Sequence, residues 1–429
     1  MSERYQKSEQ WLERALRTIP VGSQTFSKSK TQFPPGVSPY FIKKGLGSHV
    51  WDVDGNEYID FINGLGCITL GYGDPDVKSA VQTQLEAGTI FSLPHPLEVE
   101  VAEKLVDVIP CAEMVRFGKN GSDATAAAIR LARAYTRRDH VAVCGYHGWQ
   151  DWYIGSTTRN LGVPEATQKL THKFSYNNID SLAAIFKDRP DGVAAVIMEA
   201  MNVTPPATGF LESVRDLSHR HGAVFIFDEV VTGFRFANGG AQEYFGVTPD
   251  LAAFGKGIAN GFPLSLVTGK AGIMRLMEDI FFSTTFGGET LSLAAAQAVL
   301  EKYQRLPVIE TLIRQGKKVL EGVQRLLVEK DLSPAISISG HPSWTFLQFK
   351  DCRGYSQWEI KTLFLQEMFK RGILTFATHN MSFSHSDEDI AKLLNTETEV
   401  FQIIHEALDG KDLEKRLHCK PLEPLFKVR

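Results

Sequence analysis

Residues 223–228 read AVFIFD, an apolar run that ends in a carboxylate. A similar run, VAAVIM, occupies residues 193–198, and the intervening segment 211–221 has apolar residues at helical spacing. Strands that are apolar at nearly every position are typical of a sheet covered on both faces. A strand, a helix and another strand in succession are typical of a mostly parallel sheet. This stretch therefore predicts an α/β fold.

The same alternation extends along the chain on both sides of this stretch. Strand and helix patterns near the C-terminus lack the regular order, which indicates a second domain of α+β type. We therefore predict a large domain, with a mostly parallel sheet flanked by helices, and a smaller α+β domain. The large domain's expected strands are 113–117, 140–144, 193–198 and 223–228; its expected helices are 97–109, 122–136, 179–187 and 211–221, and a long helical pattern covers 291–329.

A β-hairpin is expected near the N-terminus. Residues 50–53 and 58–62 alternate in polarity around Asp54-Gly55-Asn56, which has the composition of a tight turn. We expect this hairpin to pack with the smaller domain. The expected division of the chain is 1–69 for the N-terminal segment, 70–310 for the large, cofactor-binding domain and 311–429 for the smaller domain.

The composition is that of an ordinary globular protein. Lysine and arginine number 46 against 50 aspartates and glutamates, which gives a net charge of −4 without a dominant basic block. This argues against nucleic acid or an anionic membrane as the main partner. No run reaches the roughly 18 apolar residues of a membrane span. The N-terminal residues lack the apolar core of a signal peptide, and the five cysteines form no C-x-x-C pair. We expect a cytoplasmic protein without a metal site.

The start of the expected helix 122–136 is a candidate phosphate site. Gly121 allows a ligand to approach the backbone, and Ser122 or Asp123 can cap the helix. The exposed N–H groups of a helix start attract an anion. An ordinary N-cap with a glycine turn has the same sequence pattern, so this motif alone leaves both interpretations open.

Two further positions carry reactive side chains. Asp228 and Glu229 directly follow a buried strand, at the sheet edge where ligands bind in α/β folds. Lys256 stands between Gly255 and Gly257, where a desolvated amine can attack a carbonyl. Taken singly, the aspartate can cap a turn, the acidic pair can hold a metal, and the lysine can be a solvated loop residue.

Together these motifs match the needs of pyridoxal 5′-phosphate. The helix start offers donors to its phosphate, and the pair Tyr146-His147 offers a stacking face to its ring. Asp228 offers an anion to the pyridine nitrogen, and Lys256 offers an amine to the aldehyde. No other common cofactor requires this set of groups.

Five stretches also resemble a known family. They are NGSDATAAAIRLARA (120–134), GYHGW (145–149), FIFDEVVTGFR (225–235), PDLAAFGKGIANGFPL (249–264) and STTFGGETLSLAAAQAVL (283–300). They resemble the class III aminotransferases of pyridoxal-phosphate fold type I, and most of all the glutamate-1-semialdehyde aminomutase branch. The resemblance implies a homodimer, with Lys256 as the Schiff-base lysine and Asp228 as the partner of the pyridine nitrogen. It places Val230 on the ring face opposite Tyr146, and Glu199 and Asn202 near the ring and its 3-hydroxyl. It also implies that Gly121 and Ser122 bind the phosphate together with Thr285 of the neighbouring subunit.

Three departures separate the chain from the aminomutases. Residues 376–384 hold no carboxylate, whereas the aminomutases carry a glutamate there. Lys28 stands where they have a carboxylate-binding arginine, and lysine lacks the bidentate fork. The segment after Trp149 is shorter than their mobile loop. Intramolecular exchange requires retention of the intermediate, so we predict an aminotransferase acting between separate molecules, with aminomutase activity as the alternative.

The acceptor of the amino group is predicted from the residues that replace the carboxylate-binding residues of the aminomutases. Lys28, His379 and Asn380 suit hydroxyls or a phosphate. We expect a polar carbonyl acceptor, such as a keto-sugar or a small hydroxylated or phosphorylated aldehyde or ketone, with glutamate as a candidate donor. The other interpretation is that these residues face solvent or the dimer interface.

Two other classes of protein fit the sequence less well than a pyridoxal-phosphate enzyme. A nucleotide-binding oxidoreductase would need a third glycine after Gly64 and Gly66, but that position is Thr69. A catalytically inert binding protein on the same fold is the second alternative, because fold does not establish function; loss of Lys256 or Asp228 would indicate it, and this chain keeps both.

Overall fold

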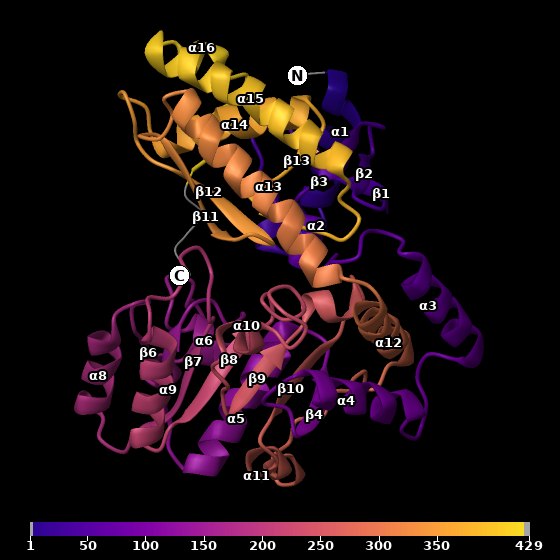
Figure 1. The fold of residues 1–429 in the computed structure, drawn as a ribbon, viewed down its shortest axis with the longest axis vertical. Coiled ribbons are helices and arrows are strands. Elements are labelled where there is room, and N and C mark those ends of the chain that lie inside the picture. The colour runs from indigo at the N-terminus through magenta and orange to yellow at the C-terminus, as the bar shows by residue number, and fades with distance from the viewer. Residues whose placement is uncertain (1–2, 424–429) are drawn as a thin grey trace. The chain divides into compact units, whose positions relative to one another are not determined.

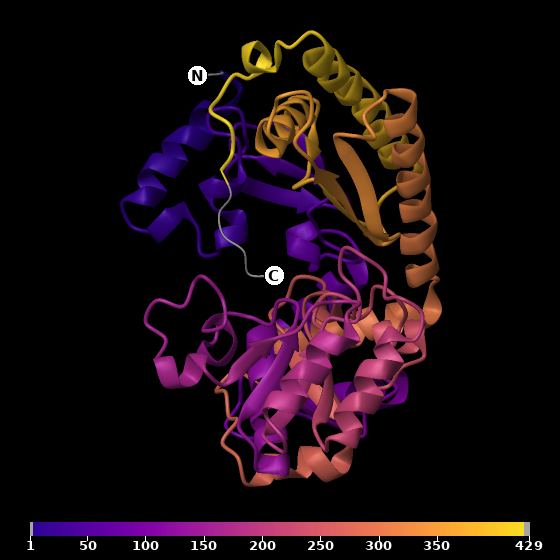
Figure 2. The same cartoon turned by 90° about the vertical axis from the view of Figure 1, so that its left-hand side faces the viewer.

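The computed structural model describes residues 3–423, which form two compact units (Figures 1 and 2). The larger unit comprises residues 75–309. The smaller unit combines residues 3–74 with residues 310–423. Segments from both ends of the described chain therefore build the smaller unit.

A seven-stranded sheet forms the centre of the larger unit. Its strand order is β4-β10-β9-β8-β7-β5-β6. Neighbouring strands are parallel, except that β10 is antiparallel to both β4 and β9. The predicted α/β fold with a mostly parallel sheet is thereby confirmed. The strands are β4 Met114–Gly118, β5 His140–Cys144, β6 Thr171–Lys173, β7 Val193–Met198, β8 Val224–Glu229, β9 Leu251–Phe254 and β10 Ser265–Gly269.

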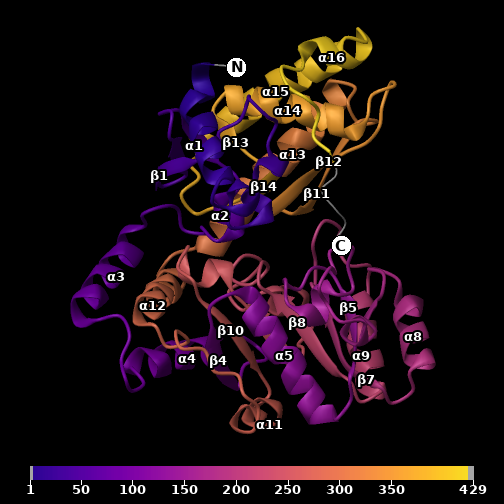
Figure 3. The same cartoon turned by 180° about the vertical axis from the view of Figure 1, so that it is seen from behind.

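Burial explains why the central strands could be predicted. Every residue of β7 and β8 is buried, as expected for a sheet covered on both faces. Helix α5 packs against β9 and β10 through a face rich in alanine, which allows close approach (Figure 3). The helices of this unit are α3 Pro75–Ala87, α4 Pro96–Val108, α5 Gly121–Thr136, α6 Asp151–Ile154, α7 Glu165–Gln168, α8 Ile179–Asp188, α9 Phe210–Arg220, α10 Ala241–Phe245, α11 Ala271–Met274 and α12 Thr290–Arg305.

The long helical pattern over 291–329 is two helices rather than one. Helix α12 ends at Arg305, and α13 runs from Val308 to Glu329. Pro307 separates them, because proline restricts the preceding residue and supplies no backbone donor.

The smaller unit holds two sheets and four long helices. One sheet has the order β1-β2-β3-β13, and the other has the order β11-β12-β14. Strands β2 and β3 form the predicted hairpin, and β13 pairs with β3 in parallel. The strands are β1 Ile42–Leu46, β2 His49–Asp52, β3 Glu57–Asp60, β11 Ile336–His341, β12 Trp344–Phe349, β13 Ile373–Leu374 and β14 Thr378–Asn380; the helices include α1 Gln6–Leu16, α2 Asn63–Gly66, α14 Gln357–Lys370, α15 Asp387–Asp409 and α16 Leu413–Arg416.

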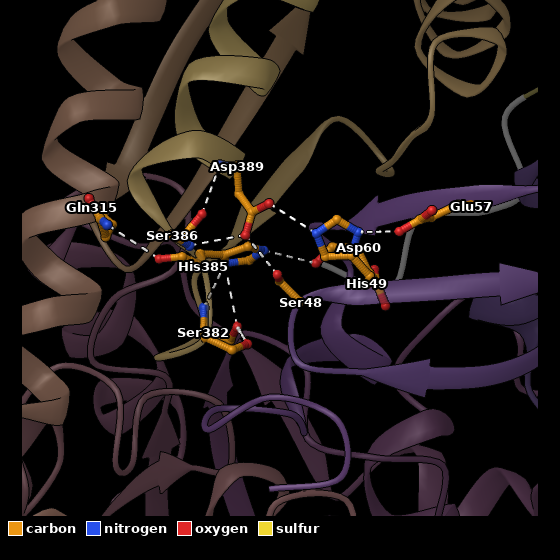
Figure 4. A network of polar contacts seen from close by, with 10 residues as sticks. Ser48, His49, Glu57, Asp60, Gln315, Ser382, His385, Ser386 and Asp389 are labelled. Carbon is orange, nitrogen blue, oxygen red and sulfur yellow. Dashed lines mark hydrogen bonds and ion pairs between the residues drawn. The ribbon is translucent and has the colours of Figure 1, made fainter.

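A polar network joins the N-terminal hairpin to the start of α15 (Figure 4). The carboxylate of Asp389 accepts hydrogen bonds from Ser48 Oγ at 2.7 Å and from the backbone N–H of Ser386 at 3.0 Å, and it lies 3.0 Å from His49 Nε2. The buried His385 ring stacks on Phe61 with centroids 4.5 Å apart. Segments more than 300 residues apart are thus fixed to each other within one unit.

Residues 3–423 contain neither a membrane-spanning helix nor a cluster of metal-binding side chains. No helix there combines the length and the apolar character needed to cross a membrane. Within the same range, no group of three or more histidine, cysteine, aspartate or glutamate side chains is placed to hold a metal ion.

Candidate active site

The predicted site residues of the larger unit lie at one edge of its sheet. Tyr146 follows the end of β5, Glu199 follows β7, Asp228 is the penultimate residue of β8, and Lys256 follows β9. These four strands are parallel neighbours in the order β9-β8-β7-β5. Their carboxyl ends therefore meet, which is where α/β folds bind ligands.

His147 is a direct partner of Asp228. Its Nδ1 atom lies 2.8 Å from Asp228 Oδ2, and the two residues are 1% and 5% exposed. The backbone N–H of Val230 donates to the other carboxylate oxygen at 3.1 Å. His147 Nε2 is buried and has no partner among the described residues. The aspartate is therefore held at both oxygens.

The pair Tyr146-His147 does not act as one stacking unit in this structure. The Tyr146 ring is 38% exposed and meets Tyr153 edge-on, with centroids 5.7 Å apart. The His147 imidazole is buried beside Asp228 instead. Sequence reasoning missed this hydrogen bond because nothing in the local pattern connects residues 81 positions apart.

The start of α5 leaves a hydroxyl unpaired. Asp123 accepts hydrogen bonds from the backbone N–H groups of Asn120 at 2.7 Å and Lys119 at 3.1 Å, so the aspartate caps this end. Ser122 Oγ is buried and has no partner among the described residues. Thr125 Oγ1 donates to the His147 carbonyl at 2.8 Å, which joins the helix to the turn after β5.

Glycines bring the site's backbone segments into contact. A Cβ on Gly121 would lie 2.7 Å from Val230 Cγ1, and a Cβ on Gly255 would lie 3.4 Å from the same atom. The α5 start, the turn after β8 and the backbone before Lys256 are therefore adjacent. Larger side chains at these glycines would close the space between the segments.

Lys256 has a strained backbone. Its φ angle is +46°, in the left-handed region that non-glycine residues rarely occupy. Such a conformation costs about 1–3 kcal/mol and is most frequent at functional sites. The side chain is half-buried, directly after the apolar strand β9.

Glu199 and Asn202 form a second polar pair at this edge. Asn202 Nδ2 lies 3.1 Å from each Glu199 carboxylate oxygen, and the backbone N–H of Tyr146 donates to one of them at 3.1 Å. Asn202 Oδ1 is buried and has no partner among the described residues. It can accept a hydrogen bond from a ligand hydroxyl.

Thr285 is the one predicted residue that the structure does not bring into this group. It lies exposed in the loop before α12. The same loop is tied to the phosphate-site backbone through Lys119, whose Nζ lies 3.0 Å from Glu289 Oε2.

The residues present fit pyridoxal 5′-phosphate. Ser122 Oγ is an orphaned donor at the N-terminus of a sixteen-residue helix, which suits a phosphate. The buried Asp228 carboxylate suits a protonated ring nitrogen. Lys256 supplies a half-buried amine, and Asn202 Oδ1 an orphaned acceptor.

The expectation that His379 and Asn380 contact an acceptor is wrong. His379 is 0% exposed, and its ring nitrogens lie 2.9 Å from Thr345 Oγ1 and 3.1 Å from Glu397 Oε1. Asn380 Nδ2 donates to the Ile62 carbonyl at 2.9 Å. Both belong to β14 and are buried, although adjacent strand residues point to opposite faces of the sheet, so both faces of β14 are covered here. Lys28 is exposed.

Comparisons with known proteins agree with this geometry. A family model described as aminotransferase class-III matches residues 32–341. A 3-aminobutyryl-CoA aminotransferase from Cloacimonas acidaminovorans is 34% identical over 88% of this chain and 92% of its own length. A glutamate-1-semialdehyde 2,1-aminomutase from Desulforamulus reducens is 35% identical over 94% and 99%. The pyridoxal-phosphate form of the FumI protein from Sphingopyxis sp. MTA144 superposes with a TM-score of 0.88 at 28% identity, covering 94% of this chain and 98% of that one.

Proposed function

Because this chain belongs to the class III aminotransferase family and is an enzyme with pyridoxal 5′-phosphate as its cofactor, we propose that it transfers an amino group between two separate small molecules. The observation that best supports this proposal is the buried Asp228 carboxylate, held by His147 and by the Val230 N–H, at the sheet edge that Lys256 follows and near the unpaired Ser122 hydroxyl.

Each residue has a distinct role in the proposal. Ser122 and the N–H groups at the start of α5 bind the phosphate, with Gly121 leaving room for it. Asp228, held by His147 and by the Val230 N–H, keeps a proton on the ring nitrogen. When bound, the cofactor supplies an electron sink that stabilises negative charge on the donor's Cα.

Lys256 is the proposed acid and base. Its amine would hold the cofactor covalently through the aldehyde group. Once free, the same amine would act as base and acid, taking the proton from the donor's Cα. Val230 and Tyr146 are proposed to hold the ring from its two faces, with Glu199 and Asn202 beside its 3-hydroxyl.

Transfer between separate molecules is favoured over aminomutase activity by residues 376–384, which contain no carboxylate to engage the substrate. The second candidate is glutamate-1-semialdehyde aminomutase activity, supported by relatives of that name at 35% identity. An assay of glutamate-1-semialdehyde without added acceptor separates the two functions: an aminomutase forms 5-aminolevulinate, and an intermolecular enzyme does not.

The structure leaves fewer residues to select the acceptor than the sequence argument used. With His379 and Asn380 buried, Lys28 is the one remaining polar residue of that argument. We propose an acceptor with a carbonyl and a polar or anionic group. A panel of keto-sugars, phosphorylated aldehydes, keto acids and a 3-oxoacyl thioester, with glutamate as donor, tests this proposal through formation of 2-oxoglutarate. No product with any acceptor would reject it.

A cytoplasmic homodimer completes the proposal. The five cysteines are free thiols, which suits a reducing compartment. The exposed hydroxyl of Thr285 can serve a phosphate in a second copy of the chain. Sedimentation of the cofactor-loaded enzyme gives the oligomeric state directly.

A further inference from the structure

A cavity of about 440 Å³ lies at the carboxyl ends of β5, β6 and β7. Its wall is mainly apolar, with contributions from Val143, Phe174 and Val203. It shares Glu199 and Asn202 with the proposed cofactor site, whereas Ser122, Asp228 and Lys256 are not among its lining residues. The cavity therefore adjoins the proposed site at these two shared residues.

The sheet order gives this cavity two chemically different ends. Strand β5 lies between β7 and β6. Lys173 pairs with Val143 at the end of β6, and Glu199 follows Met198, which pairs with Cys144. Neighbouring strands are about 4.8 Å apart, so the backbones at Lys173 and Glu199 are separated by about 10 Å.

At the Glu199 end of the cavity, neighbouring neutral donors hold the carboxylate in place. It accepts from the Tyr146 N–H and from the Asn202 amide, all at 3.1 Å. This network also fixes the amide orientation, because the NH₂ group must face the carboxylate. Asn202 Oδ1 is therefore an acceptor, and it lacks a partner among the described residues.

The Lys173 end is positive. The residue is exposed at the rim, and it makes no ion pair with any residue of 3–423. The thiol of Cys144, midway along the wall, stays neutral because burial raises its pKa to about 12. Among the described residues that line the cavity, the one carboxylate is Glu199, which lies at the other end of the wall.

We propose that this cavity binds the part of the substrate that does not react, an aliphatic chain ending in an anion that pairs with Lys173. The proposal rests on the proposed function, since it assigns the cavity to a substrate of the same site. An apolar wall with a few polar groups is the usual form of a small-molecule pocket, and the volume suits such a chain. The reacting end lies toward Glu199 and Asn202, next to the proposed cofactor site.

The proposal can be tested by measuring, with calorimetry, how tightly hexanoate and hexanol bind to the cofactor-loaded protein. Neither probe has an amine or a ketone, so neither can undergo amino transfer. Hexanoate should bind more tightly than hexanol. Lys173→Met should weaken hexanoate about threefold to tenfold and leave hexanol unchanged, and Lys173→Arg should retain most of the affinity. Val203→Phe, which fills the cavity, should weaken both probes. Lys187→Met removes an exposed lysine of α8 and should change neither.

Equal hexanoate affinity in wild type and Lys173→Met, or no binding of hexanoate at all, would overturn the proposal. Unchanged binding of both probes in Val203→Phe would overturn it as well. The proposed function fails by a different result, namely the absence of amino transfer with any donor and acceptor. The two proposals can therefore fail separately.

Discussion

His147 Nδ1 lies 2.8 Å from Asp228 Oδ2, and neither side chain is accessible to more than a trace of solvent. The hydrogen bond joins the turn after β5 to the end of β8, across the intervening strand β7. The second oxygen of Asp228 is held by the Val230 N–H. The carboxylate thus has a fixed orientation before any ligand binds, which is the condition for electrostatic preorganisation.

Asp228→Asn should slow proton removal from the donor by several orders of magnitude. The neutral amide cannot stabilise a positive charge on the ring nitrogen, so the electron sink is weakened. Rapid mixing of the cofactor-loaded variant with an amino donor measures this step in a single turnover. The cofactor should still bind, which its absorbance reports, and a wild-type single-turnover rate would exclude the role.

His147→Phe should lower the free energy of unfolding by about 1–3 kcal/mol. The substitution leaves a buried carboxylate without one of its donors. Denaturant titration of the cofactor-free protein gives the difference. His219→Phe is the matched control, since His219 Nε2 also lies 2.9 Å from an aspartate, Asp250, but its side chain is 42% exposed. We expect a loss below about 1 kcal/mol there. Equal losses in both variants would contradict the argument.

Lys256→Ala should abolish amino transfer and the covalent attachment of the cofactor. Borohydride treatment of the wild type should fix pyridoxal phosphate to the chain, and peptide mass spectrometry should find it on Lys256. The variant should release the cofactor on denaturation after the same treatment. Lys187→Ala controls for loss of a surface amine. Turnover by Lys256→Ala near the wild-type rate would refute the assignment.

Mixed dimers should show whether Thr285 serves the partner's site. Thr285→Asp places a negative charge where a phosphate is expected, so this variant and Lys256→Ala should each be inactive. Subunit exchange then gives heterodimers in which one site carries both defects and the other carries neither. Recovery of up to about half of a dimer's activity is expected, because the two sites of a closed dimer are equivalent. Absence of recovery after verified exchange would count against a shared site.

Acidification should destabilise the protein partly through His385. Burial lowers the pKa of this imidazole to about 4, whereas an unfolded histidine titrates near pH ~6.5. Between these values the unfolded chain binds a proton that the folded chain does not. The free energy of unfolding therefore falls as the pH drops from about 6.5 to about 4, by up to about 3 kcal/mol from this residue.

Denaturant titrations at several pH values check the slope. His385→Gln should reduce it, and part should remain because burial also lowers the pKa of His172 to about 4. His418→Gln, at an exposed position, serves as the control. An unchanged slope in His385→Gln would show that this imidazole is not the group that titrates.

Several features followed from the sequence because their causes are local. The predicted strands 193–198 and 223–228 correspond to β7 and β8, in which every residue is buried, because a sheet covered on both faces favours runs of apolar side chains. The turn Asp54-Gly55-Asn56 formed the expected hairpin. The family was recognisable because its motifs are short and contiguous, and strand order then brings Asp228 and Lys256 to one edge.

Other features were decided by tertiary structure, because they depend on which distant segments meet. The antiparallel direction of β10 could not be predicted from its own sequence, because it depends on pairing with β4, about 150 residues earlier in the chain, as well as with β9. His147 faces Asp228 since β5 and β8 end at the same edge. His379 and Asn380 were predicted to contact a ligand, but segments that cover both faces of β14 bury them, and they hydrogen-bond to Glu397 and to the Ile62 carbonyl instead. Residue type sets what a side chain can bind, and the packing of remote segments sets whether it faces a ligand or the core.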